Sequence, residues 1–218
     1  MLDAIEIETG PEAQASVIWL HGLGADGSDF EPIVGELALP ARPIRFVFPH
    51  APTRPVTING GMVMRAWYDI LGNDVARRED AAGVRASQRG IEALIARERE
   101  RGTAAGRIVL AGFSQGGAIA LQTALRHPER LAGIMALSTY VPIADSLTAE
   151  AHAANRATPI FMAHGVHDPI VPVALGRRSR DLLASLGYAV EWREYPMPHA
   201  VCAEEIVDIG AWLRSVLA

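Results

Sequence analysis

The sequence has little cysteine, few aromatic residues and no excess of basic charge. Cys202 is the only cysteine, so neither an intrachain disulfide nor a metal site built from paired cysteines can form. The formal net charge of −5 leaves no basic footprint for nucleic acid and no polybasic membrane patch. No apolar run reaches the roughly 18 residues of a membrane-spanning helix. The first residues also lack the features of a secretory signal. We therefore expect a cytoplasmic protein without stable membrane insertion.

Half of the residues are hydrophobic, and they occur in short apolar runs between segments of helical period. The runs predict strands at 15–20, 44–49, 107–112, 131–138, 158–165 and 189–195. Helical spacing predicts helices at 29–37, 82–101, 115–126, 174–186 and 203–217. Apolar strands that alternate with helices are typical of a parallel sheet covered on both faces. The sequence thus predicts a single α/β domain over residues 1–218, with a long irregular loop at 50–75 that is a candidate functional loop.

The segment "GFSQG" at 112–116 lies between a predicted strand and a predicted helix. In that context the pattern G-x-S-x-G is typical of the nucleophile elbow, a sharp turn that presents a serine hydroxyl at a helix N-terminus. The amide N–H of Gln115 is then placed to donate to a developing oxyanion. The alternative is a glycine-rich turn in which Ser114 only caps the helix. The flanking strand and helix, with the additional Gly117, favour the elbow.

A serine hydroxyl is a weak nucleophile, so it needs a base that a third group orients. In α/β-hydrolases the order is serine, acid, histidine, each on a loop after a strand. Asp168 in "HGVHDPIVP" and His199 in "YPMPHAVCAEE" satisfy both the order and the context. We predict that His199 accepts the Ser114 proton and that Asp168 orients the imidazole. The alternatives are a turn role for Asp168, Asp145 as the acid, and an ordinary loop role for His199.

The second oxyanion donor is expected on the loop after an early strand. The segment "LHGLGADGSDF" at 20–30 is such a loop, and its glycines allow an inward-facing amide, for which we predict Leu23. A plain strand–helix connection is the alternative. No HExxH motif or comparable ligand cluster occurs. We therefore expect no metal and no other cofactor.

Several segments spread over nearly the whole chain carry a family resemblance. They are "LHGLGADGSDF", "FPHAPTRPVTINGG", "AWYDI", "VLAGFSQGGAIAL", "LSTYVP", "HGVHDPIVP" and "EEIVDIGAWL". In this order they resemble the phospholipase/carboxylesterase family of serine hydrolases, also described as the acyl-protein thioesterase group, and especially its bacterial carboxylesterase branch. The resemblance implies an α/β-hydrolase without a cap domain. It also implies a triad of Ser114, Asp168 and His199, with the amides of Leu23 and Gln115 as the oxyanion hole.

The same resemblance implies a substrate class. It indicates a serine carboxylesterase that hydrolyses short- to medium-chain esters, with acyl-protein thioesterase or lysophospholipase activity on long acyl chains as the alternative. A non-catalytic ligand-binding relative is a remote alternative, because such proteins usually lose a triad member. The substrate is expected to be a small-molecule acyl ester or thioester. Relatives often form dimers, so a homodimer is an expectation.

The loop that matches "PVTINGGMVM" flanks the acyl channel in this family. The residues expected to line that channel are Ile58, Met62 and Trp67, together with Val171. Ordinary packing of these side chains against the core is the alternative.

The chain departs from the family pattern at two places. Pro198 stands where the family usually has glycine before the base, and proline fixes φ and lacks an N–H. We therefore expect the His199 loop to be stiffer or differently placed. Arg65 stands in "MRAW" where the family often has "MPSW", which puts a charge near the expected channel mouth. Cys202 could be a nucleophile or a redox switch, but it lies in no supporting motif, so we expect a structural or incidental role for it.

Overall fold

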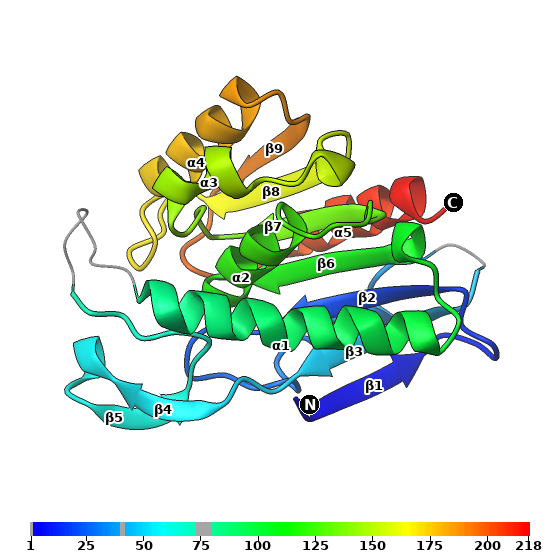
Figure 1. The fold of residues 1–218 in the computed structure, drawn as a ribbon, viewed down its shortest axis with the longest axis horizontal. Helices are drawn as coiled ribbons and strands as arrows, with labels where there is room; N and C mark the ends of the chain where they lie inside the picture. The colour runs from blue at the N-terminus through cyan, green and yellow to red at the C-terminus, as the bar shows by residue number, and fades with distance from the viewer. Residues whose placement is uncertain (1, 40–41, 73–79) are drawn as a thin grey trace.

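The protein is built around a seven-stranded sheet in the order β1-β3-β2-β6-β7-β8-β9, seen in a computed structural model that describes residues 2–39, 42–72 and 80–218 (Figure 1). The strands are β1 (Ala4–Glu8), β2 (Ala15–Leu20), β3 (Ile44–Pro49), β6 (Ile108–Phe113), β7 (Gly133–Leu137), β8 (Ile160–Gly165) and β9 (Val190–Tyr195). Neighbouring strands are parallel except for β1, which runs antiparallel to β3. This confirms the mostly parallel sheet predicted from the apolar runs.

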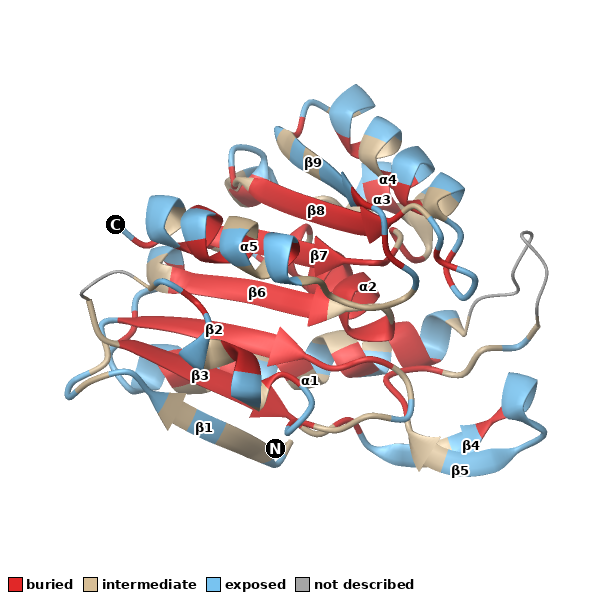
Figure 2. Ribbon diagram, turned by 180° about the vertical axis from the view of Figure 1, so that it is seen from behind, coloured by how far each residue is buried: buried red, intermediate tan, exposed pale blue. Residues whose placement is uncertain are grey.

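Helices cover both faces of this sheet (Figures 1 and 2). One face carries α1 (Ala81–Glu100), α2 (Gln115–Ala124), α3 (Ala144–Glu150) and α4 (Val173–Ser185), and the other carries α5 (Ala203–Val216) and the 3-10 helix η1 (Glu31–Gly35). Successive residues of β2 alternate between the two cores: Ile18 packs with α1 and α2, whereas Trp19 packs with η1 and α5. Because both faces are covered, the central strands are buried almost throughout (Figure 2).

Two elements that the sequence did not predict flank this frame. The edge strand β1 alternates half-buried and exposed residues, and Glu6 and Glu8 pair with arginines, among them Arg101 and Arg45. The helix α3 is only seven residues long. The remaining short elements are the 3-10 helices η3 (Ala105–Arg107) and η4 (Ala153–Asn155).

The predicted irregular loop at 50–75 contains a hairpin, and the predicted helix at 29–37 is much shorter than expected. Strands β4 (Thr53–Val56) and β5 (Met62–Arg65) pair antiparallel across the 3-10 helix η2 (Thr57–Asn59). The expectation for 29–37 was wrong because a local turn precedes the helix. Asp26 Oδ1 accepts hydrogen bonds from both the backbone N–H and the hydroxyl of Ser28, and only the five residues of η1 follow.

Candidate active site

Ser114 lies in a sharp turn between β6 and α2, at the carboxyl edge of the sheet. Its φ of 55° and ψ of −121° fall where a residue with a side chain is strained. The surrounding chain leaves no room for side chains. A Cβ on Gly112 would lie 2.3 Å from the carbonyl carbon of Gly116, and a Cβ on Gly116 would lie 2.4 Å from the Leu20 carbonyl oxygen. The glycines therefore allow β6, α2 and β2 to approach closely, and the turn lifts Ser114 above them.

Gln115 is the first residue of α2, and its side chain is fixed by two hydrogen bonds. Its Oε1 accepts from the Trp67 backbone N–H at 2.8 Å, and its Nε2 donates to the Tyr68 carbonyl at 2.7 Å. N–H groups in the first turn of a helix have no partner within the helix. The backbone N–H of Gln115 is thus held in orientation beside Ser114. Sequence reasoning identified this amide but missed the side-chain anchor, since its partners lie almost fifty positions away in the chain.

The loop after β2 carries Leu23 to the same place, where it lines one cavity with Ser114 and Gln115. His21 anchors this loop. Its Nε2 accepts from the Ala51 backbone N–H at 3.0 Å, so its Nδ1 carries the proton and donates to the Gly22 carbonyl at 2.7 Å. Burial lowers the pKa of His21, which keeps the ring neutral in this arrangement. Sequence reasoning missed His21. Its position directly after a buried strand was the available signal.

Asp168 and His199 reach the turn from the loops after β8 and β9. His199 Nδ1 donates to Asp168 Oδ2 over 2.6 Å, because an ionised carboxylate can only accept. The other carboxylate oxygen of Asp168 accepts from the backbone N–H groups of Ile170 and Val171, each at 2.8 Å. These three bonds fix the buried carboxylate and the imidazole together. Asp145, the alternative acid, lies in the first turn of α3 instead.

Pro198 leaves His199 within hydrogen-bond distance of Asp168. The Pro198 carbonyl accepts from the Ala200 N–H at 2.9 Å, so the turn uses the carbonyl of the proline and does not require the missing N–H. On the sheet side, the ring centroid of His199 lies 4.6 Å from that of Phe113, which directly precedes Ser114. The structure thus brings together all three residues predicted as a triad at one edge of the sheet.

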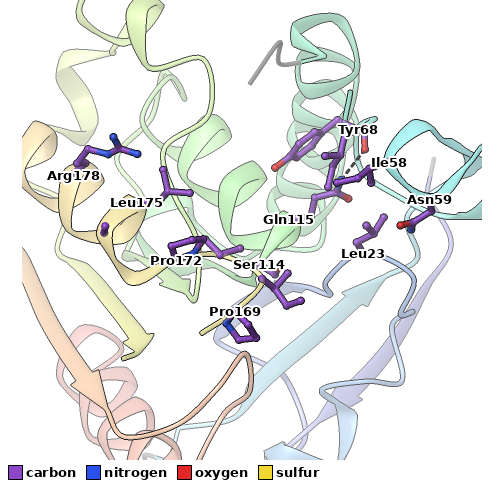
Figure 3. A pocket seen from close by; sticks show the side chains of 14 residues that line it. Leu23, Ile58, Asn59, Tyr68, Ser114, Gln115, Pro169, Pro172, Leu175 and Arg178 are labelled. Carbon is purple, nitrogen blue, oxygen red and sulfur yellow. Dashed lines mark hydrogen bonds between the residues drawn. The ribbon is translucent and has the colours of Figure 1, made fainter. Parts of the chain in front are cut away.

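A cavity of about 770 Å³ opens beside Ser114 (Figure 3). Its walls come from the Leu23 loop, from segment 57–70, from the loop after Asp168 and from the start of α4. They consist of Leu23, Ile58, Asn59, Tyr68, Ile70, Ser114, Gln115, Pro169, Ile170, Val171, Pro172, Ala174, Leu175 and Arg178. Most of these side chains are apolar, as expected of a site for a hydrocarbon group. Ile58 and Val171, two of the residues expected along the acyl channel, are among them.

The expectation that Met62 and Trp67 line the cavity was wrong. Met62 is 63% exposed on the outer hairpin and lies outside the cavity. Trp67 is fully buried, and its Nε1 donates to the His21 carbonyl, while its neighbour Tyr68 lines the cavity instead. The guanidinium of Arg65 donates to the Ala51 carbonyl at 2.8 Å. The positive charge at the cavity wall belongs to Arg178 of α4.

A second hollow, a groove of about 360 Å³, lies next to His199 and Phe113. It shares no lining residue with the cavity beside Ser114. One wall comes from the segment 29–36 and the other from the His199 loop and the start of α5. The lining residues are Asp29, Phe30, Pro32, Ile33, Glu36, Phe113, His199, Ala200, Val201 and Ile206. We name this hollow the His199 groove. Sequence reasoning missed it because its walls are more than 160 positions apart in the chain.

A family model described as phospholipase/carboxylesterase matches residues 3–217. The chain belongs to this family. It is therefore an α/β-hydrolase that acts on esters, as its sequence motifs predicted, with esters or thioesters as its class of substrate.

The chain is similar to known relatives and to solved structures along most of its length. It is 43% identical to the acyl-protein thioesterase 1 of Neurospora crassa over 213 residues, which cover 93% of this chain and 87% of the relative. It is 40% identical to the acyl-protein thioesterase 1 of Gibberella zeae over 213 residues, which cover 93% of this chain and 91% of the relative. The crystal structure of acyl-protein thioesterase 2 from Zea mays superposes with a TM-score of 0.86 at 28% identity, covering 99% of this chain and 100% of the maize chain.

Within the described residues, no group of three or more histidine, cysteine or carboxylate side chains has an arrangement that holds a metal ion. Over the same part of the chain, every helix is too short or too polar to cross a bilayer.

Cys202 directly precedes α5, three positions after His199. Its side chain is half-buried, and burial raises the pKa of the thiol. A thiol with a raised pKa carries less of the reactive thiolate. These features favour the structural role expected for Cys202.

Glu205, in the first turn of α5, gives a test of stability against pH. It is fully buried, and among the described residues no group makes a hydrogen bond of good geometry to its carboxylate. The backbone N–H of Cys202 lies near the carboxylate and offsets only part of the effect of burial. Burial, with a smaller contribution from Asp208, raises the pKa of Glu205 from 4.5 to about 8. Between pH 4.5 and about 8 the folded protein therefore keeps a proton on Glu205 that the unfolded chain has lost. The free energy of unfolding consequently falls as the pH rises through this range.

We expect Glu205→Gln to remove this loss. At pH 8 the variant should exceed the wild type in unfolding free energy by roughly 4 kcal/mol, while the two should match near pH 4.5. Urea unfolding at a series of pH values measures the difference. The exposed neighbour Glu204→Gln is the matched control, and an equal effect of both substitutions would contradict the assignment to Glu205.

Proposed function

We propose that this chain is a serine carboxylesterase that works through an acyl-enzyme on Ser114. The hydrogen-bonded pair of Asp168 and His199, which packs against Phe113 next to Ser114, is the observation that supports this function, together with the apolar cavity that Ser114 lines. Ser114 Oγ attacks the ester carbonyl while His199 Nε2 accepts its proton. The amides of Leu23 and Gln115 donate to the oxyanion. His199 then gives the proton to the departing alcohol, and water hydrolyses the acyl-enzyme by the reverse path.

Asp168 has a separate role in this scheme. It holds the proton of His199 on Nδ1, so that Nε2 is free to accept the serine proton. The two backbone N–H groups on its other oxygen keep the carboxylate from rotating away. The apolar cavity binds the acyl group, and its burial supplies about 0.8 kcal/mol for each methylene.

A thioesterase that removes acyl groups from proteins is the second candidate. The size of the cavity favours it, because about 770 Å³ leaves room for more than a short acyl chain. The names of the fungal relatives, acyl-protein thioesterase 1, point the same way. The same residues serve both reactions, since His199 protonates a departing thiolate as it does an alkoxide. The cytoplasmic location and the homodimer expected from the sequence stay predictions.

The test combines active-site labelling with a chain-length series. A fluorophosphonate should label Ser114 alone, as peptide mass spectrometry would show. Values of kcat/KM for p-nitrophenyl esters and matched thioesters, from acetyl to palmitoyl, then separate the candidates. A maximum at short esters supports the carboxylesterase, and a rise toward long thioesters supports the acyl-protein thioesterase. Absence of label, or label on another serine, would contradict both.

Leu175, in the first turn of α4, should set the acyl length that the cavity accepts. We expect Leu175→Trp to fill part of the cavity and exclude about two methylenes, which lowers kcat/KM for long acyl chains on the order of tenfold. Acetyl esters should be cleaved at the wild-type rate. The same chain-length series measures the change. Val207→Trp, at an exposed position on α5, is the control and should leave the profile as it is.

A further inference from the structure

The His199 groove lies where the proposed mechanism requires the leaving group. A general acid must be within hydrogen-bond reach of the atom that it protonates. The group that departs from the acyl-enzyme therefore sits on the His199 side of Ser114, away from the cavity that takes the acyl chain. Among the described residues, His199 lines this groove and is absent from the cavity wall.

The groove has an apolar floor and an acidic rim. Phe30, Ile33 and Phe113 supply buried or half-buried apolar surface, while Asp29 and Glu36 supply exposed carboxylates. Neither carboxylate has an ion-pair partner within the described part of the chain, and no lysine or arginine lines the groove. Burial, and then the charge of Asp26, raise the pKa of Asp29, as expected for a carboxylate without a cation beside it.

Charges around the groove have the same sign on both walls. The segment 26–36 contains four acidic residues and no basic residue, and the first turn of α5 adds the exposed Glu204. The buried Glu205 beside it adds no charge near neutral pH, because burial raises its pKa to about 8. The arginine of α5, Arg214, lies in its last turn and donates to the Ala38 carbonyl. The acyl cavity is different, since its lining contains Arg178 and no acid. The two hollows beside the reactive residues thus carry charges of opposite sign.

The spacing of the two rim carboxylates indicates an extended occupant. Asp29 and Glu36 flank the five residues of η1. A 3-10 helix rises about 2 Å per residue, so the carboxylates are separated by on the order of 10 Å. A single ammonium group cannot contact both, whereas a peptide with basic residues on either side of a cysteine can.

We infer that the His199 groove binds the leaving group as a cationic peptide, so that the preferred substrate is an S-acylated cysteine with lysine or arginine beside it. This inference rests on the proposed acyl-enzyme at Ser114 and adds the nature of the leaving group. The apolar floor takes the backbone and aliphatic stems next to the cysteine. Asp29 and Glu36 face the cationic ends. Exposed pairs of this kind act mainly on encounter and orientation, and salt screens them.

The test uses three S-octanoyl peptides that differ only beside the cysteine, with lysine, serine or glutamate. For the wild-type enzyme at low salt we expect kcat/KM for the lysine peptide to exceed that for the glutamate peptide by about tenfold, and high salt to reduce this ratio. The double variant Asp29→Asn/Glu36→Gln should bring the ratio to about threefold or less. Glu100→Gln, at the opposite edge of the sheet, changes the net charge without touching the groove and should keep the ratio.

Each outcome decides between the proposals. Equal rates for the three peptides, with p-nitrophenyl esters cleaved and Ser114 labelled, would overturn this inference and leave the esterase intact. Failure to cleave any ester would overturn both. A choline ester cleaved faster than its neutral dimethylbutyl analogue, without discrimination among the peptides, would assign the groove to a small ammonium alcohol and overturn the peptide assignment.

Discussion

Ser114→Ala is expected to lower kcat for ester hydrolysis on the order of 10⁶-fold, by comparison with serine hydrolases in which the nucleophile has been removed. In the proposed mechanism no acyl-enzyme forms without the hydroxyl, and the amides of Leu23 and Gln115 are left to stabilise only a direct attack by water. KM should change little, because the cavity that binds the acyl group is unaltered. Active-site-titrated enzyme and p-nitrophenyl butyrate provide the measurement.

Folding must be separated from chemistry in this variant. Alanine has to adopt the same φ of 55° as Ser114, so we expect the strain and the melting temperature to stay close to those of the wild type. Ser185→Ala, on the exposed end of α4, is the matched control and should retain full activity. If Ser114→Ala hydrolyses esters at the wild-type rate, the nucleophile lies elsewhere.

Asp168→Asn should lower kcat on the order of 10⁴-fold, the loss known for the equivalent change in a serine protease. The two backbone N–H groups that now bind Oδ1 require an oxygen, so the asparagine turns its NH₂ toward His199. His199 Nδ1 must then accept, and the ring proton moves to Nε2. That tautomer cannot accept the proton of Ser114.

Asp145→Asn is the matched control for this prediction, because Asp145 is the acid that the sequence left as an alternative. It should keep the wild-type kcat. The ¹⁵N chemical shifts of the His199 ring should show the proton on Nδ1 in the wild type and on Nε2 in Asp168→Asn. Loss of activity in Asp145→Asn, with Asp168→Asn unaffected, would reverse the assignment.

The sequence was sufficient for the elements that have a strong local signal. Strands such as 15–20 and 44–49 are continuous apolar runs with turns on both sides, and the structure has them with the same bounds. Strand β1 was missed because an edge strand is half-exposed and shows no such run. The hairpin of β4 and β5 was missed because its proline and glycine residues hide the alternation.

The site followed the same rule. Ser114, Asp168 and His199 have motifs or chain order to mark them, and the structure brings them together. His21 and the side chain of Gln115 carry no motif, since their importance comes from hydrogen bonds to residues far away in the chain. Tertiary packing decides which of Trp67 and Tyr68 faces the cavity. The sequence alone therefore assigned Trp67 to the cavity wall, where the structure has Tyr68.

The side chain of Gln115 joins two parts of the enzyme that are usually considered separately. It is hydrogen-bonded to the backbone of Trp67 and Tyr68, and Tyr68 lines the cavity that we propose for the acyl chain. Its own backbone N–H points to the reacting carbonyl in the proposed mechanism. Binding of the acyl chain and polarisation of the ester carbonyl therefore depend on the same side chain. An acyl chain that packs closely against Tyr68 also holds the Gln115 N–H in place at the carbonyl. The length of the acyl chain should therefore affect kcat as well as KM.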